Sequence, residues 1–98
     1  AIGYGTLQAQ NYSTATDGYN VAVGYATGAS ITTGIENTLI GGAAGDSLTD
    51  ADNNVAVGFL ALSTDTLGSR TVAIGNLALF TQNFTTATNS YNTAVGYA

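Results

Sequence analysis

The chain has 98 residues and a formal net charge of −5, and Arg70 is its only basic residue. Because it contains no His, Lys or Cys, it lacks the usual general bases, thiol nucleophiles and soft metal ligands, and a single Arg is too few for a nucleic-acid interface. We therefore expect a non-enzymatic protein with no cofactor, no metal and no nucleic-acid partner, and the lack of a long apolar run argues against membrane insertion.

A five-residue motif that ends in Gly recurs along the whole chain. In chain order its copies occupy residues 1–3, where the motif is cut short, and residues 20–24, 37–41, 54–58, 71–75 and 92–96. The spacings between the closing glycines, in the same order, are 21, 17, 17, 17 and 21. Such a period indicates one repeat array over residues 1–98, and we expect the array to be a segment of a longer fibre.

Each motif copy predicts a short β-strand. Val and Ile favour strands, and a Gly in every unit disfavours a helix. Both alternating faces of the motif are apolar, which is typical of parallel strands that are covered on both sides. The sequence therefore predicts an all-β parallel β-solenoid with one coil for each repeat unit, whether its length is 17 or 21.

Equivalent motif positions of successive units form columns of side chains along the array. The alternation of side chains between the two strand faces assigns a role to each column. We expect the β-branched column to fill the coil interior: Ile2, Val21, Val23, Ile40, Val55, Val57, Val72, Ile74 and Val95. We expect the small-residue column to form a subunit interface: Ala22, Leu39, Ala56, Ala73 and Ala94. Gly tolerates positive φ or close contact where a strand turns a corner, which predicts these turn glycines: Gly3, Gly24, Gly41, Gly58, Gly75 and Gly96.

The segments between the motif copies return the chain to the next coil. A second apolar patch after the glycine, such as Leu60 and Leu62 or Leu77 and Leu79, predicts a second short strand. A polar corner follows, and the longer units extend it by four residues. The motif also stacks an amide column, which predicts a hydrogen-bonded ladder: Asn20, Asn37, Asn54 and Asn92, with Thr71 as the exception.

The repeated Asn-[Thr/Val]-[Ala/Leu]-[Val/Ile]-Gly motif resembles the head-domain repeat of trimeric autotransporter adhesins, the YadA-like head. It is also similar to repeat arrays in bacteriophage tail fibres. The unit lengths of 17 and 21 residues favour this second similarity. The resemblance implies a left-handed β-roll, a homotrimer and an extracellular place on a cell surface or virion. It further implies a rigid spacer with adhesion to a host receptor or glycan, where three identical sites would act together.

The two longer units carry aromatic residues at matching positions. These rings are either a candidate adhesion surface or a cover for the open edge of the extended corner. They are Tyr12 and Tyr19 in the first unit and Phe84 and Tyr91 in the second.

Two other functions deserve a test against the sequence. Asp46, Asp50 and Asp52 could bind calcium, but we expect a solvated acidic corner instead, because no other coil repeats these acids. A monomeric ice-binding or other surface-binding β-solenoid is the alternative to a fibre, because Thr-x-Thr pairs suit a flat ice-binding face. The pairs stand at different distances from the turn glycines, however: Thr14 and Thr16, Thr64 and Thr66, and Thr86 and Thr88.

Overall fold

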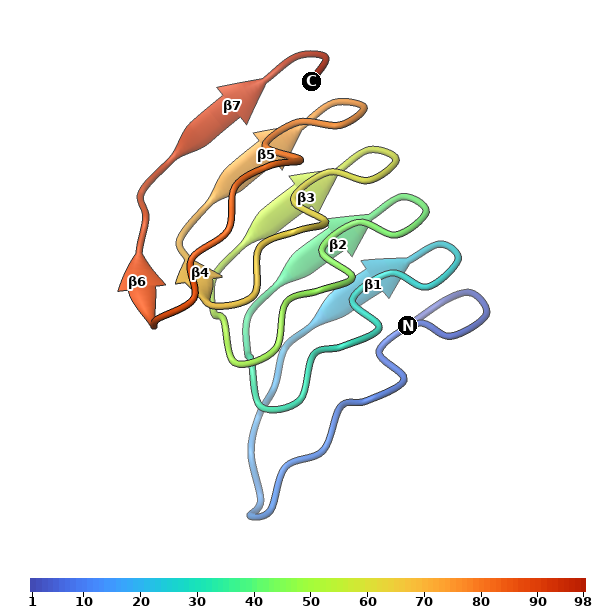
Figure 1. Cartoon of the computed structure of the whole chain (residues 1–98). Coiled ribbons are helices and arrows are strands. Elements are labelled where there is room, and N and C mark those ends of the chain that lie inside the picture. Colours follow the sequence, from blue (N-terminus) through green and yellow to red (C-terminus); the bar gives the residue numbers. More distant parts are fainter.

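The computed structural model describes all 98 residues and is an all-β solenoid of about four turns without any helix (Figure 1). No helix is therefore available that could cross a membrane. The strands are short, and their bounds are β1 Val21–Val23, β2 Thr38–Ile40, β3 Val55–Val57, β4 Gly68–Ser69, β5 Val72–Ile74, β6 Thr88–Asn89 and β7 Thr93–Val95.

Like strands stack on like strands. Five of them form one parallel sheet in the order β1-β2-β3-β5-β7, while β4 and β6 form a small second parallel sheet. The register joins equivalent motif positions, so that Ala22 faces Leu39 and Ala73 faces Ala94. Ile2 extends the stack by a single parallel bridge to Val23. The predicted parallel solenoid with its long and short coils is therefore confirmed.

The two faces of the strands are reversed relative to the prediction. The small column lies in the coil interior, where Ala22, Leu39, Ala56 and Ala73 are buried and Ala94 is half-buried. The β-branched column points outward, and even in central strands Ile40 and Ile74 are 39% and 38% exposed. The expected core residues are therefore exposed or only half-buried, with Ile2, Val21 and Val95 exposed and Val23, Val55, Val57 and Val72 half-buried.

The reversal has a steric cause in the narrow coil. Leu39 fits inside because glycines lie opposite it: a Cβ on Gly28 or on Gly45 would come within 2.9 Å of a Leu39 methyl carbon. In the next coil, Leu62 takes the place of Gly45, and Ala56 takes the place of Leu39. Large and small residues therefore alternate across the interior, and a column of Val and Ile would not fit there.

The return segments supply the larger buried side chains. Ile31 and Leu48 are fully buried and stand at equivalent positions of successive coils. Together with Leu62 and alanines from the same segments they form one core cluster with the inner face of the sheet. The hydrophobic core thus runs as a continuous column along the stack, as expected when each coil buries its neighbour.

The turn glycines combine positive φ with close stacking. Their φ angles lie between +128° and +137°. A Cβ on Gly41 would lie 2.5 Å from the carbonyl oxygen of Gly58 in the next coil. Both conditions exclude a side chain, so Gly is required by backbone conformation and by the approach of neighbouring coils.

The second apolar patch forms turns, so the expected second strand is wrong at this position. Residues of this patch adopt left-handed φ angles of about 50–60°, as in Ala26, Ala43, Leu60 and Leu77. This conformation directs the N–H toward the preceding coil: Ala43 N–H donates to Tyr25 O at 2.8 Å, and Leu60 N–H donates to Gly42 O at 3.0 Å. Hydrogen bonding along the stack therefore outweighs the cost of positive φ for these residues.

The amide column forms a ladder of side-chain and main-chain bonds. Asn20 Oδ1 accepts the Asn37 N–H at 2.9 Å, Asn37 Oδ1 accepts the Asn54 N–H at 3.0 Å, and Asn54 Oδ1 accepts the Thr71 N–H at 2.9 Å. The Nδ2 of each of these three Asn also donates to a carbonyl oxygen in a return segment, as Asn54 does to Gly68 at 2.9 Å. Asn37 and Asn54 are completely buried, so these bonds replace the water that their amides lose.

Candidate interaction surfaces

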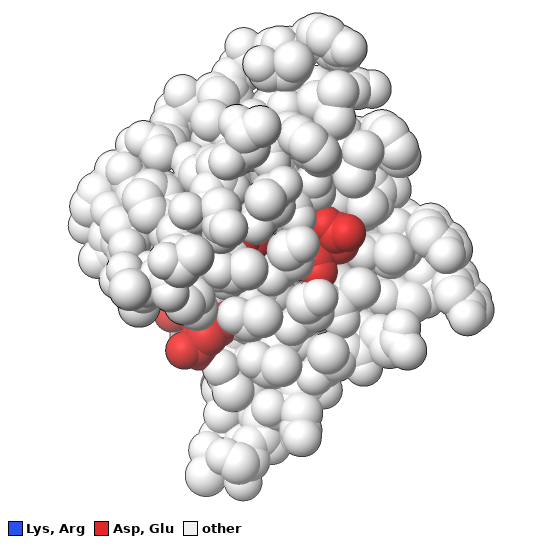
Figure 2. Space-filling view, in the orientation of Figure 1, with Lys and Arg blue, Asp and Glu red and all other residues white.

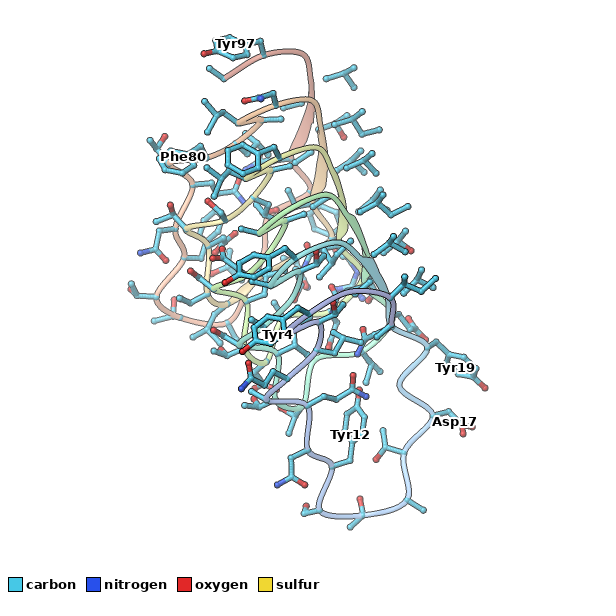
Figure 3. All side chains as sticks on the ribbon, turned by 90° about the vertical axis from the view of Figure 1, so that its right-hand side faces the viewer. Tyr4, Tyr12, Asp17, Tyr19, Phe80 and Tyr97 are labelled. Carbon is cyan, nitrogen blue, oxygen red and sulfur yellow. The ribbon has the colours of Figure 1, made fainter.

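The most extensive apolar surface is the outer side of the main sheet, which we call the outer sheet face. Two rows of side chains project from the strands, away from the return segments (Figure 3). Nearly every member is Val or Ile, and the face contains no charged residue: Val21, Val23, Thr38, Ile40, Val55, Val57, Val72, Ile74, Thr93 and Val95.

Charged residues lie elsewhere on the molecule. All six acids belong to the return segments and corners, and none belongs to a strand. On the side seen in Figure 2, acidic atoms appear in two small areas and no basic atom is visible. The outer sheet face can therefore be covered without burying a charge, which would cost far more than covering apolar side chains.

The four aromatic residues of the longer units divide into two pairs. Tyr12 and Phe84 are half-buried, whereas Tyr19 and Tyr91 are 71% and 70% exposed. The Tyr12 hydroxyl donates to Gly34 O at 2.9 Å and accepts from Asn20 Nδ2 at 3.1 Å. Figure 3 shows Tyr12 turned in toward the coils and Tyr19 turned away from them.

These contacts give Tyr12 and Phe84 a structural role. The Phe84 ring lies over Gly68, where an added Cβ would come within 2.8 Å of Phe84 Cδ2. In the same way, a Cβ on Gly18 would collide with the Tyr12 ring. The inward rings thus fill the extended corners and keep only part of their surface open, whereas most of the Tyr19 and Tyr91 surface is exposed.

Tyr91 has a cationic neighbour. The guanidinium carbon of Arg70 lies 5.9 Å from the centre of the Tyr91 ring, and Arg70 Nη1 donates to Asn89 Oδ1. This distance is within the range of a cation–π contact. The single basic residue therefore holds the base of the second long corner through its contacts with Asn89 and Tyr91.

A second aromatic column was missed in the sequence. It stands directly after the turn glycines, in Tyr4, Tyr25, Phe59 and Tyr97, and all four rings are exposed. Tyr4 and Tyr25 are stacked, with ring centres 5.7 Å apart and planes inclined by 13°. The recurrent Gly-Tyr or Gly-Phe step was the signal that could have identified this column.

A polar pocket of about 240 Å³ lies between the first long corner and the two corners stacked next to it. The long corner contributes Tyr12, Ser13, Thr14 and Thr16, and the neighbouring corners contribute Thr33, Ile35, Asp50 and Asp52. A larger, mainly apolar hollow of about 600 Å³ lies at the other end of the stack, between residues 77–81 and 93–98.

Asp65 is buried, although it lies in a polar stretch between two motif copies, where a carboxylate would ordinarily be solvated. It is fully buried and follows Ile31 and Leu48 in the same column. Its Oδ1 accepts the N–H groups of Gly68 at 3.1 Å and Phe84 at 2.9 Å, and its Oδ2 accepts from Gln82 at 2.6 Å. Asp65 therefore anchors the long corner that begins in the next coil.

The three acids considered as calcium ligands do not form a cluster. No group of three or more acidic side chains lies close enough together to hold a metal ion. Burial raises the pKa of the Asp46 carboxyl above its usual range, and the backbone N–H groups of Asp46 and Ser47 oppose this effect. Asp46 Oδ1 has no hydrogen-bond partner, whereas Asp50 bonds to Thr33 and Asp52 bonds to the Ile35 N–H at 2.9 Å.

The Thr-x-Thr pairs do not line one face. In both long corners the second Thr hydroxyl donates to the carbonyl oxygen of the first, Thr16 to Thr14 at 3.1 Å and Thr88 to Thr86 at 2.9 Å. The hydroxyl of Thr66 instead donates to Phe84 O in the next coil at 2.9 Å. These hydroxyls thus stabilise corners of different shape.

Comparison with protein-family models, curated proteins and solved structures finds no match to this chain.

Proposed function

We propose that this chain is a structural segment of an extracellular or virion fibre, of the kind that the YadA-like head and bacteriophage tail-fibre repeats represent. In this role it carries out no catalysis. Three copies associate through the outer sheet face and form a rigid spacer, and the projecting corners provide adhesion to a receptor.

The observation that carries this proposal is the uncovered outer sheet face. Parallel sheets are nearly always covered on both sides, whereas here only the inner side is covered by the chain itself. Val21, Ile40 and Ile74 leave between 38% and 49% of their surface open, with no charge among them. A second and a third copy would remove this apolar surface from water.

The choice of this face differs from the interface expected from the sequence. The alanine column lies inside the coil and is not available to a partner. The β-branched rows take its place, because they repeat in register over five strands and form a straight apolar surface. Three copies, rather than two, follow the resemblance to trimeric fibres.

The stacked coils suit a spacer. The molecule measures 37 × 28 × 18 Å, and successive coils are joined by main-chain bonds along the stack and by the Asn ladder. Such an array resists bending because each coil is held by two neighbours. The first long corner projects beyond the body of the solenoid at the lower end of Figure 1, where it is open to a receptor.

The mass in solution tests this proposal. We expect about 29 kDa by light scattering after size exclusion, three times the 9.8 kDa of one chain. Ile40→Lys should reduce the mass to that of one chain while the β-sheet circular dichroism is retained, because like charges would meet in the interface. The control Thr64→Lys places the same charge on an exposed corner and should leave the trimer intact. A wild-type chain that is monomeric at all concentrations would contradict the proposal.

A further inference from the structure

We propose that the polar pocket at the first long corner binds a single neutral sugar ring. The inference rests on the proposed function only for the biological role of the site, in which the bound sugar would be the receptor group of an adhesive fibre. The site itself is derived from the lining of the pocket, and its test does not require a trimer.

The pocket is held in place by hydrogen bonds before any ligand arrives. The Tyr12 hydroxyl is hydrogen-bonded to Gly34 O and Asn20 Nδ2. Asp52 is held both at its carboxylate and at its main-chain N–H. Its Oδ1 accepts the Ile35 N–H at 2.9 Å, and its own N–H donates to Ser69 Oγ at 3.0 Å. A lining that is already ordered loses little conformational entropy on binding.

The lining retains unused hydrogen-bonding capacity. Asp50 and Asp52 each use only one carboxylate oxygen, toward Thr33 and Ile35 respectively, so the second oxygen of each can accept a bond from a ligand. The hydroxyl of Ser13 makes no bond within the chain and can both donate and accept. A sugar hydroxyl has the same two capacities, and its bond to a carboxylate is charge-assisted and strong.

The charges of the pocket select among ligands. The two carboxylates repel an anionic group, and Arg70, the only basic residue, is not part of the lining. No third His, Cys, Asp or Glu lies close enough to these two carboxylates to complete a group of three that could hold a metal ion. The ligand that fits is therefore rich in hydroxyl groups and free of negative charge.

The size and the apolar part of the pocket point to one ring. Its volume of about 240 Å³ lies below the roughly 300–1,000 Å³ of pockets for drug-sized molecules. Tyr12 and Ile35 supply apolar surface against which the C–H groups of a sugar can pack. A single hexose uses the hydroxyl, carboxylate and apolar parts of the lining together.

Titration by nuclear magnetic resonance tests the site directly. The ¹⁵N-labelled protein is titrated with the methyl glycosides of glucose, galactose and mannose. We expect at least one of them to produce saturable shifts in the amides of residues 12–16, 33–35 and 50–52, with a Kd on the order of 1 mM. Asp50→Asn and Ser13→Ala should each weaken this Kd, the former about tenfold.

A matched control separates this site from general effects of charge. Asp17→Asn removes an exposed acid from the same long corner, outside the pocket, and should leave the Kd unchanged. The inference is overturned if none of the glycosides shifts the pocket amides, if the shifts lie elsewhere, or if only a protonated amine such as spermine binds. A trimer that binds no glycoside would overturn this inference alone, whereas a monomer that binds one would overturn the trimeric fibre alone.

Discussion

Gln82 lies one coil after Asp65, and its Nε2 donates a hydrogen bond of 2.6 Å to Asp65 Oδ2. The same Gln82 accepts a bond from Asn92 Nδ2 at 2.7 Å and donates to Thr71 Oγ1 at 3.3 Å. This relationship stands where a short coil meets a long coil and where Thr71 replaces Asn in the ladder. Asp65 and Gln82 thus take over, at the junction between coils of different length, the role that an Asn side chain plays in the rest of the ladder.

Replacing Asp65 by Leu, the residue of the preceding coil, should destabilise the protein. The change leaves the N–H groups of Gly68 and Phe84 without their acceptor in the interior. A buried unsatisfied donor costs about 1–3 kcal/mol, and the Phe84 N–H, which is only partly buried, adds less. We therefore expect the free energy of unfolding in urea to fall by about 2 kcal/mol. Asp17→Leu, at an exposed corner, should change it by less than about 0.5 kcal/mol. An equal effect of both substitutions would contradict the role of Asp65.

Substitution can separate the two reasons why Gly is required at the strand ends, which are its positive φ and the close approach of the next coil. Gly41 and Gly96 have similar φ angles of 130° and 137°, but only Gly41 has a carbonyl oxygen 2.5 Å from an added Cβ. Gly96→Ala should therefore cost only the backbone strain, about 1–3 kcal/mol. Gly41→Ala should cost clearly more, measured as the difference in free energy of unfolding at one protein concentration. Equal losses would show that close stacking adds nothing.

The alternation of large and small interior residues predicts a rescue. Ala56→Leu should lower the free energy of unfolding by about 1–3 kcal/mol, because Leu62 already fills the space beside it. Adding Leu62→Gly recreates the Leu39–Gly45 arrangement of the preceding coil and should recover most of the loss. The measurement is a double-mutant cycle, and additive losses from the two substitutions would refute the complementary packing.

The position of Asp46 predicts a dependence of stability on pH. Burial raises the pKa of this carboxyl, so the folded state holds the proton more tightly than the unfolded state. Protonation therefore favours folding at low pH, and this contribution is lost as the pH rises from the usual Asp pKa of about 4 through the raised value. Asp46→Asn should raise the Tm at pH 7, and the difference from the unchanged protein should vanish at about pH 3. A difference that is constant with pH would contradict the assignment.

The repeat alone was sufficient to predict the stacking of the strands. The spacing of the turn glycines correctly paired Ala22 with Leu39 and Ala73 with Ala94, because equivalent residues of a solenoid must meet in register. The direction of the strand faces could not be obtained in the same way. Both faces are apolar, so the alternation distinguishes two columns without indicating which is inside.

The size of the coil interior determines which face of each strand is buried, and this size depends on residues far from the motif. Leu39 is accommodated by Gly28 and Gly45 in the return segments, whose approach to the strand follows from the turns of left-handed residues. The burial of Asp65 could not be predicted from the sequence for a related reason. A carboxylate in a polar stretch is usually exposed, and only the extra length of the next corner creates the donors that bury it.

The direction of the bonds between coils has a mechanical consequence. Apart from the bonds that close turns within a coil, the main-chain N–H groups donate to carbonyl oxygens of an adjacent coil, as Val21 does to Asn37 and Val55 does to Thr71. A tensile load along the axis is therefore shared by every bond of one layer, and no single bond bears it alone. Such a rod resists stretching up to a threshold and then yields one whole layer at a time.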